Sequence, residues 1–172
     1  MFQQYIGHHK KKGFTLSEII IAIAVLSFGV VLVYGAFFVA FNTTMSTGPR
    51  FIAAYLAQDG QEIIRNLRDN NIVEGEFWSA GLTGSPCNAG CQADYKTLET
   101  SELDEFTDTV LSLNADGFYG YDIGGTPTIF KREIMVSPVL GTTDVIKVLV
   151  LITWDYKGEP FSLTAEEYLY DE

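Results

Sequence analysis

The feature that most constrains this chain is an uncharged apolar tract near its N-terminus, residues 19–41. As an α-helix its 23 residues rise roughly 34 Å at about 1.5 Å each, enough to cross a bilayer core of about 30 Å. Residues 1–13 hold three lysines and no acid. The positive-inside rule therefore predicts a cytoplasmic N-terminus and an extracytoplasmic chain after the tract.

One acid stands at the threshold of this tract. Glu18 directly precedes Ile19 and follows the apolar residues Phe14 and Leu16. An acid in a transmembrane helix costs about 2.5–3.5 kcal/mol at the helix centre and less near its edge, so it usually has a partner and a function. No basic residue follows before Arg50, so we expect no partner for Glu18 within its own helix.

Gly13-Phe14-Thr15-Leu16-Ser17-Glu18, followed by the apolar tract, resembles the N-terminal processing signature of type IV pilins and of type II secretion pseudopilins. In that family, prepilin peptidase cuts after the glycine and methylates the new N-terminal residue. The resemblance implies cleavage between Gly13 and Phe14 and N-methylation of Phe14. It implies a processing role for three lysines, Lys10, Lys11 and Lys12.

The same resemblance implies that Glu18 pairs with the α-amine of Phe14 on a neighbouring subunit during assembly. An α-amine has a pKa of about 7.7–8, so it is largely cationic near neutral pH, and N-methylation keeps the charge. Cleavage would thus create the cation that Glu18 lacks. The implied partners are other pilin subunits, prepilin peptidase, the pilus assembly platform and membrane lipid.

Two other interpretations of the N-terminus remain open. One is a plain signal-anchor helix that carries a glutamate at its edge. The other is a cleaved secretory signal, with residues 33–35 as a weak cleavage site. The tract is longer than the usual apolar region of about 7–15 residues in such signals, which favours the pilin-like interpretation. Many major pilins carry a proline midway through this helix, whereas this chain has Gly29 and Gly35 there.

The charge of the chain argues against nucleic acid as a partner. The formal net charge is −11, and loss of the three lysines in residues 1–13 would take it to −14. Binding to phosphates needs a basic surface. We therefore expect no nucleic-acid partner, which disfavours a DNA-binding competence pseudopilin.

The sequence offers little for catalysis. Its two histidines, His8 and His9, lie in the first 13 residues, so the rest of the chain lacks the commonest general base. No phosphate-binding glycine motif occurs. We expect neither an enzyme nor a cofactor.

Cys87 and Cys91 are the only cysteines, in Cys-Asn-Ala-Gly-Cys. Outside the membrane a disulfide is permitted, and the Asn and Gly let so short a loop turn sharply. We favour a local disulfide, with free thiols and, least, a metal site as alternatives. Asn114, Asp116 and Asp122 offer oxygen ligands for a hard cation, but Asn-Ala-Asp-Gly is more typical of a β-turn.

The hydrophobic pattern predicts an α+β fold. We expect a long N-terminal helix, apolar in its first half and amphipathic in its second, packed on a C-terminal antiparallel sheet of three to four main strands. Pro49 predicts a kink or short interruption, after which the helix resumes over residues 51–70. The expected parts are a leader (1–13), a transmembrane and assembly helix (14–47) and an extracytoplasmic domain (48–172).

In the resumed helix, an apolar stripe with helical spacing is expected to face the sheet: Ile52, Leu56, Gly60, Ile63 and Leu67. Four charged residues are expected to face water or loops: Asp59, Arg65, Arg68 and Asp69.

Residues 128–138 and 145–156 read as strands. The second has apolar residues on both faces and is predicted to be central, with residues 160–170 as its hairpin partner. The first alternates, with Phe130, Arg132, Ile134 and Val136 on one face. Residues 117–121 predict another short strand, ended by the Gly-Gly-Thr-Pro of residues 124–127.

Residues 72–117 predict a connecting loop, with short edge strands at residues 94–95 and 106–113. Phe77 and Trp78 are expected to fill the core, with an exposed recognition patch as the alternative. The acids between residues 99 and 108 predict a solvated face.

Residues 54–58 and 62–65 are also similar to the minor pilin V group, in a loose motif. The sequence as a whole predicts a structural subunit, most like a minor pilin, of a type IV pilus or related pseudopilus. It would lie in the cytoplasmic membrane, then in an extracellular or periplasmic fibre. The alternative is a bitopic membrane-anchored sensor or ligand-binding protein with an outward-facing domain.

Overall fold

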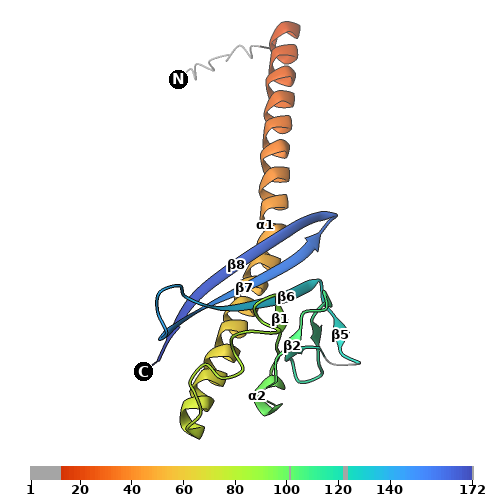
Figure 1. Ribbon diagram of the computed structural model, residues 1–172. Coiled ribbons are helices and arrows are strands. Elements are labelled where there is room, and N and C mark those ends of the chain that lie inside the picture. Colours follow the sequence, from red (N-terminus) through yellow and green to blue (C-terminus); the bar gives the residue numbers. More distant parts are fainter. Residues whose placement is uncertain (1–12, 101, 122–123, 172) are drawn as a thin grey trace, which may run out of the picture. The chain divides into compact units, whose positions relative to one another are not determined.

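The computed structural model describes residues 13–100, 102–121 and 124–171, and for residues 42–46 it describes the backbone only. The chain divides into two compact units, Met1–Met45 and Ser46–Glu172, each of which is described by itself. Helix α1, Leu16–Glu74, contributes residues to both units (Figure 1).

In the first unit, α1 is apolar around its whole circumference. Every described side chain from Gly13 to Phe41 is exposed. The hydroxyl of Ser27 donates a hydrogen bond to the carbonyl of Ile23 at 2.8 Å, which satisfies one of its few polar groups. A helix of this composition needs lipid or other helices around it.

The interruption expected at Pro49 is absent, because α1 continues through this residue to Glu74. A proline inside a helix removes one hydrogen bond and costs about 3 kcal/mol. The flanking helical turns offset that cost, since α1 extends for several turns on both sides. The expected end near residue 70 falls four residues before the observed one.

The part of α1 in the second unit buries one stripe of its surface. Leu56, Ile63 and Leu67 are buried as predicted, together with Ala53 and Ile64. Ile52, expected in the same stripe, is 37% exposed, so that expectation was wrong.

At Gly60 the helix lies close to the sheet. A Cβ atom there would lie 3.1 Å from both Arg132 Cδ and Val150 Cγ1. Only a residue without a side chain fits this approach without displacing its neighbours.

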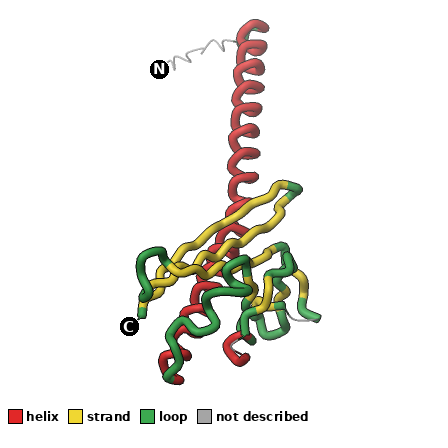
Figure 2. The backbone as a smooth tube through the Cα atoms, in the orientation of Figure 1, coloured by secondary structure: helices red, strands yellow, loops and turns green. Residues whose placement is uncertain are grey.

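The main sheet has three long antiparallel strands, as predicted: β6 (Phe130–Pro138), β7 (Val145–Tyr156) and β8 (Glu159–Tyr170). Two short strands, β1 (Cys91–Gln92) and β2 (Asp104–Glu105), extend it to the order β2-β1-β6-β7-β8. β7 lies between β6 and β8, which confirms its predicted central position (Figure 2). The α+β fold of an N-terminal helix packed on a C-terminal antiparallel sheet is therefore observed.

Alternation along the strands decides which side chains meet α1. On β7, Ile146, Val148, Val150, Ile152 and Trp154 are buried, and the residues between them are half-buried. β7 and β8 are joined by the two-residue turn Lys157-Gly158, whose φ angles of 55° and 84° match the left-handed turn favoured in hairpins.

The short elements differ most from expectation. Residues 94–95 form no strand, because Cys91–Gln92 takes the pairing with Asp104–Glu105 instead. A second, three-stranded sheet has the order β4-β3-β5, from β3 (Ser112–Leu113), β4 (Tyr119–Gly120) and β5 (Thr126–Pro127). β4 lies within the predicted strand at residues 117–121, whereas β5 forms where the sequence predicted only a turn. A single helical turn, α2 (Thr97–Thr100), was not predicted.

Candidate functional site

Gly13 and Phe14 lie just before the start of α1, and both are exposed. Lys10, Lys11 and Lys12 lie outside the described residues. The first helical residue is Leu16, so Thr15 occupies the N-cap position. The predicted processing junction and Glu18 therefore lie at the same helix end.

Glu18 has a local partner that the sequence analysis missed. Its backbone N–H donates to Thr15 Oγ1 at 3.3 Å, and the N–H of Thr15 donates to Glu18 Oε2 at 3.5 Å. This reciprocal pair is a capping box, which satisfies two backbone donors that a helix start leaves free. The Thr-x-x-Glu spacing at residues 15–18 is the sequence signal that could have revealed it.

Leu16–Phe41, 26 residues, is long and apolar enough to cross a membrane, and the mean hydropathy of an 18-residue window within it is 2.7. This agrees with the tract expected from the sequence. Within it Glu18 is the only acidic or basic residue. An exposed apolar helix with one carboxylate in its first turn is suited to insertion in lipid and to one specific polar contact at that end.

Cys87 and Cys91 form a disulfide, which confirms the favoured sequence interpretation. Both cysteines are buried, and Cys91 begins β1. The carbonyl of Cys87 accepts a hydrogen bond from the N–H of Val136 on β6 at 3.0 Å. The bridged loop is therefore attached to the main sheet.

The side-chain oxygen of Asn114 is used within a turn. It accepts hydrogen bonds from the N–H groups of Asp116 at 3.0 Å and Phe118 at 2.9 Å. Asp122, the third proposed ligand, lies outside the described residues. These contacts support the turn interpretation over a cation site. No group of three possible metal ligands occurs in the part of the chain that the structure describes.

Arg132, which the alternation of β6 placed on the same face as Phe130 and Ile134, is fully buried. Its guanidinium donates to the carbonyls of Leu56 at 3.2 Å and Ala93 at 2.6 Å, and to Asp59 Oδ2 at 2.5 Å. Asp59, expected to face water or loops, is exposed, and its Oδ2 also accepts this hydrogen bond from Arg132. The hydroxyl of Tyr121 donates to the carbonyl of Arg132 at 3.1 Å, and burial raises the pKa of that hydroxyl to about 12.

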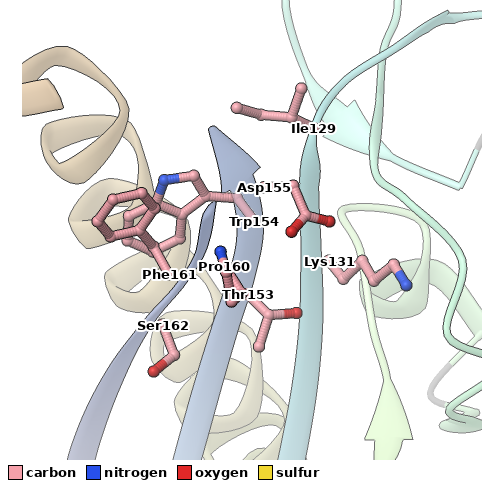
Figure 3. Close-up of a pocket in the computed structure, with 8 residues that line it drawn as sticks. All are labelled: Ile129, Lys131, Thr153, Trp154, Asp155, Pro160, Phe161 and Ser162. Atoms are coloured by element: carbon pink, nitrogen blue, oxygen red, sulfur yellow. The ribbon is translucent and has the colours of Figure 1, made fainter. Parts of the chain in front are cut away.

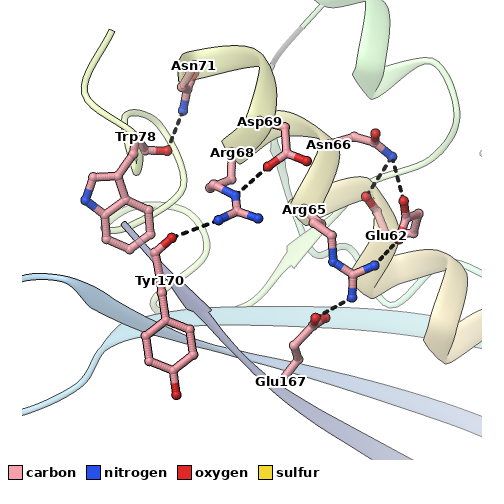
Figure 4. Close-up of polar contacts among 9 residues, drawn as sticks. All are labelled: Glu62, Arg65, Asn66, Arg68, Asp69, Asn71, Trp78, Glu167 and Tyr170. Carbon is pink, nitrogen blue, oxygen red and sulfur yellow. Dashed lines mark hydrogen bonds and ion pairs between the residues drawn. The ribbon is translucent and has the colours of Figure 1, made fainter. Parts of the chain in front are cut away.

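A second polar network joins the end of β8 to α1 (Figure 4). Arg68, expected to face water, is buried and donates to the carbonyl of Tyr170 at 2.8 Å. Arg65 pairs with Glu62 and Glu167, and its hydrogen bond to Glu167 raises the pKa of Arg65 above its ordinary value. Both arginines of α1 therefore bind residues of β8.

Asn71, also on α1, binds the loop that follows the helix. Its amide donates to the carbonyls of Trp78 at 3.1 Å and Ala80 at 2.9 Å. Trp78 is buried, as expected, but Phe77 is 64% exposed, so the expectation of two core aromatics was half right.

A shallow cleft of about 390 Å³ lies where β6, β7 and β8 meet (Figure 3). Its polar side chains offer no arrangement for nucleophilic or acid–base chemistry, since Lys131 is paired with Asp108 at 2.7 Å. The aromatic rings of Trp154 and Phe161 stack at 5.7 Å beside it. The lining residues are Ile129, Lys131, Thr153, Trp154, Asp155, Pro160, Phe161 and Ser162.

Residues 8–34 match the prokaryotic N-terminal methylation motif. Comparison with curated proteins and with solved structures found no match. Residues 8–34 of this chain therefore carry an N-terminal methylation motif, which overlaps the exposed apolar part of α1, Leu16–Phe41.

Proposed function

We propose that this chain is a structural subunit of a type IV pilus or a related pseudopilus, stored in the membrane and assembled through its N-terminal helix. The observation that carries the proposal is the methylation motif at residues 8–34 directly joined to the exposed apolar helix Leu16–Phe41. Lipid covers such a helix before assembly, and neighbouring helices cover it in a fibre.

In this proposal prepilin peptidase cuts between Gly13 and Phe14, and Phe14 is N-methylated. The basic residues Lys10, Lys11 and Lys12 hold the leader, residues 1–13, on the cytoplasmic side. Residues 14–47 form the transmembrane and assembly helix, and residues 48–172 form the extracytoplasmic domain. The pilus assembly platform then moves the subunit into an extracellular or periplasmic fibre.

Glu18 has two uses in this scheme. In the single chain its carboxylate accepts a hydrogen bond from the N–H of Thr15. In the fibre it pairs with the cationic amine of Phe14 on a neighbouring subunit. A partly desolvated ion pair gains attraction but costs desolvation, so its main contribution is to fix the register between helices.

The finer assignment is a minor subunit of the V group, supported by the helix-forming segments at residues 54–58 and 62–65. Counting copies per fibre tests it, because a minor subunit is present at a small fraction of the main subunit.

Mass spectrometry of assembled material tests the main proposal. The expected mass is that of residues 14–172 plus one methyl group, with the Cys87–Cys91 bridge retained. A chain in the fibre that still carries residues 1–13 would contradict it. A stable, uncut membrane monomer would favour the bitopic sensor instead.

A further inference from the structure

β8, Glu159–Tyr170, forms one edge of the five-stranded sheet and pairs with β7 along its whole length (Figure 1). The opposite edge is β2, which has only two residues, both of them exposed acids. A short, charged edge strand offers little to another strand. β8 is 12 residues long, and its pairing with β7 contains no bulge. The two edges of the sheet therefore differ, and only the β8 edge is long enough to pair with a further strand.

The β7–β8 turn determines which backbone groups of β8 point away from β7. In a two-residue hairpin the residues that flank the turn, here Tyr156 and Glu159, exchange two hydrogen bonds, and bonded pairs then recur at every second residue. The N–H of Asp171 donates to the carbonyl of Asp144 at 3.0 Å, which continues the same alternation beyond the end of β8. The odd-numbered residues of β8 therefore bond to β7, and the even-numbered residues direct their N–H and C=O groups outward.

The outward backbone groups of β8 are largely unpaired. Pro160 occupies the first outward position, where its missing N–H removes no hydrogen bond from the sheet. At the other end, the carbonyl of Tyr170 accepts the hydrogen bond from Arg68. These ends leave a row of donors and acceptors about 20 Å long, at about 3.4 Å per residue. Four exposed residues form this row, and their outward groups have no hydrogen-bond partner within the described parts of the chain: Ser162, Thr164, Glu166 and Tyr168.

The side chains of this edge also favour a further strand. Three apolar residues of β8 pack against the buried core but stay half-buried, so a neighbouring strand would cover them further: Phe161, Leu163 and Ala165. Unpaired charges on an edge strand oppose pairing. Here Glu166 already pairs with Lys147 at 3.1 Å, and Glu167 pairs with Arg65.

We propose that β8 pairs with an extended strand of a different subunit of the fibre, through the outward backbone groups from Ser162 to Tyr168. This proposal rests on the proposed function, because it assigns a partner within the fibre. A row of alternating N–H and C=O groups at strand spacing is matched by an extended backbone, which supplies acceptors and donors at the same spacing.

The strands of this chain favour a different protein over a second copy as the partner. β8 contains three acids, Glu159, Glu166 and Glu167, and no basic residue. Two β8 edges side by side would bring like charges together, which is unfavourable between neighbouring strands. The other edge strands among the described residues, β2, β4 and β5, have two residues each, so a second copy has no other long strand to offer. The partner strand is therefore neutral or basic and belongs to another subunit.

Amide hydrogen exchange tests the pairing without any substitution. In the full chain in detergent, the N–H groups of Thr164 and Glu166 should exchange quickly, whereas those of Leu163 and Ala165, bonded to β7, should exchange slowly. In fibres, exchange at Thr164 and Glu166 should slow by at least about a hundredfold. The measurement is residue-resolved mass spectrometry after labelled fibres are dissociated under conditions that stop exchange.

Thr164→Pro removes one outward N–H and leaves the hydrogen bonds to β7 in place. It should lower incorporation into fibres at least about tenfold, with leader removal unchanged. Thr164→Val is the matched control, because valine keeps both the N–H and the branched side chain, and it should assemble like the wild type. Urea unfolding followed by tryptophan fluorescence shows whether each variant folds. If Thr164→Pro does not fold, the exchange measurement on the wild type decides.

A photo-reactive side chain identifies the partner. Tyr168→p-benzoylphenylalanine places the reactive group at an exposed, outward position of β8. In fibres it should cross-link to a single segment of another fibre subunit. Cross-links to a second copy of this chain or only to lipid would contradict the proposed partner.

Fast exchange at Thr164 and Glu166 in fibres, or normal incorporation of a folded Thr164→Pro chain, would also overturn the strand-pairing proposal. Each of these results leaves the proposed function intact, because the chain is still cut and assembled. Failure of the wild-type chain to be cut or to assemble would overturn the proposed function, and the strand-pairing proposal with it.

Discussion

At the scale of single residues, Glu18 has an observed local role at the start of α1 and a proposed role in assembly. Its capping box with Thr15 stabilises the first turn of α1, and a negative charge there is favourable to the helix dipole. Neither contribution requires a second subunit. The local role and the pairing role therefore need variants that separate hydrogen bonding from charge.

Glu18→Gln makes this separation, because glutamine also accepts the N–H of a capping residue but carries no charge. We expect normal membrane insertion and cleavage, and incorporation into fibres lowered at least about tenfold. Glu18→Asp should be intermediate, since its shorter side chain reaches less far. The measurements are leader removal by gel shift and subunit content of sheared fibres.

Thr15→Ala is the matched control. It removes the N-cap hydroxyl, at a cost of about 1 kcal/mol in helix stability, but keeps the carboxylate of Glu18. Fibres should then contain nearly the normal amount of subunit. If Thr15→Ala and Glu18→Gln impair incorporation equally, the capping box rather than the ion pair explains the need for Glu18.

At the scale of elements, the bridged loop before β1 gives a local prediction. Replacing both Cys87 and Cys91 by serine should lower the free energy of unfolding by about 2 kcal/mol, the chain-entropy value for so small a loop. The domain should stay folded. Amide hydrogen exchange at Val136 should become faster, because its N–H donates to the carbonyl of Cys87.

Two other strand amides serve as controls for that experiment. Val148 and Ile152 lie on β7, which pairs with β6 and β8 rather than with the loop. Their exchange should change little in the serine variant. An equal acceleration at all three amides would mean that the bridge supports the whole sheet.

The long elements could be predicted from the sequence because their signals are local. The β-branched run of β7 and the alternation of β6 gave their bounds to within two residues. The two-residue strands β1 and β2 carry no such signal, because each is too short to show a period and they pair with each other across eleven intervening residues. The interruption predicted at Pro49 is absent. The local rule that a proline interrupts a helix did not hold here, because α1 continues on both sides of Pro49.

The residues of the candidate site that are close in sequence could be predicted, whereas contacts between distant residues could not. The motif around Gly13 and Glu18 is contiguous in sequence, so it was visible at once. The alternation of β6 placed Arg132 on the apolar face, but its partners Leu56 and Ala93 lie far from it in the chain. Tertiary hydrogen bonds of this kind leave no mark in a local pattern.

At the scale of the whole second unit, Ser46–Glu172, Arg132 joins three segments with one guanidinium: α1 through Leu56 and Asp59, the segment after β1 through Ala93, and β6 itself. Its side chain is fully buried, whereas that of Asp59 is 53% exposed. The buried hydrogen bonds to carbonyls should therefore matter more than the ion pair, which water partly screens.

This difference predicts unequal effects of two variants. Arg132→Met keeps much of the volume but leaves the carbonyl of Ala93 without its donor, and should cost about 2–4 kcal/mol in unfolding free energy. Asp59→Asn keeps an acceptor for Arg132 and should cost about 1 kcal/mol or less. Urea unfolding of the full chain in detergent, followed by the fluorescence of Trp78 and Trp154, measures both. Equal costs would show that the ion pair, and not the buried hydrogen bonds, holds the helix, the loop and the sheet together.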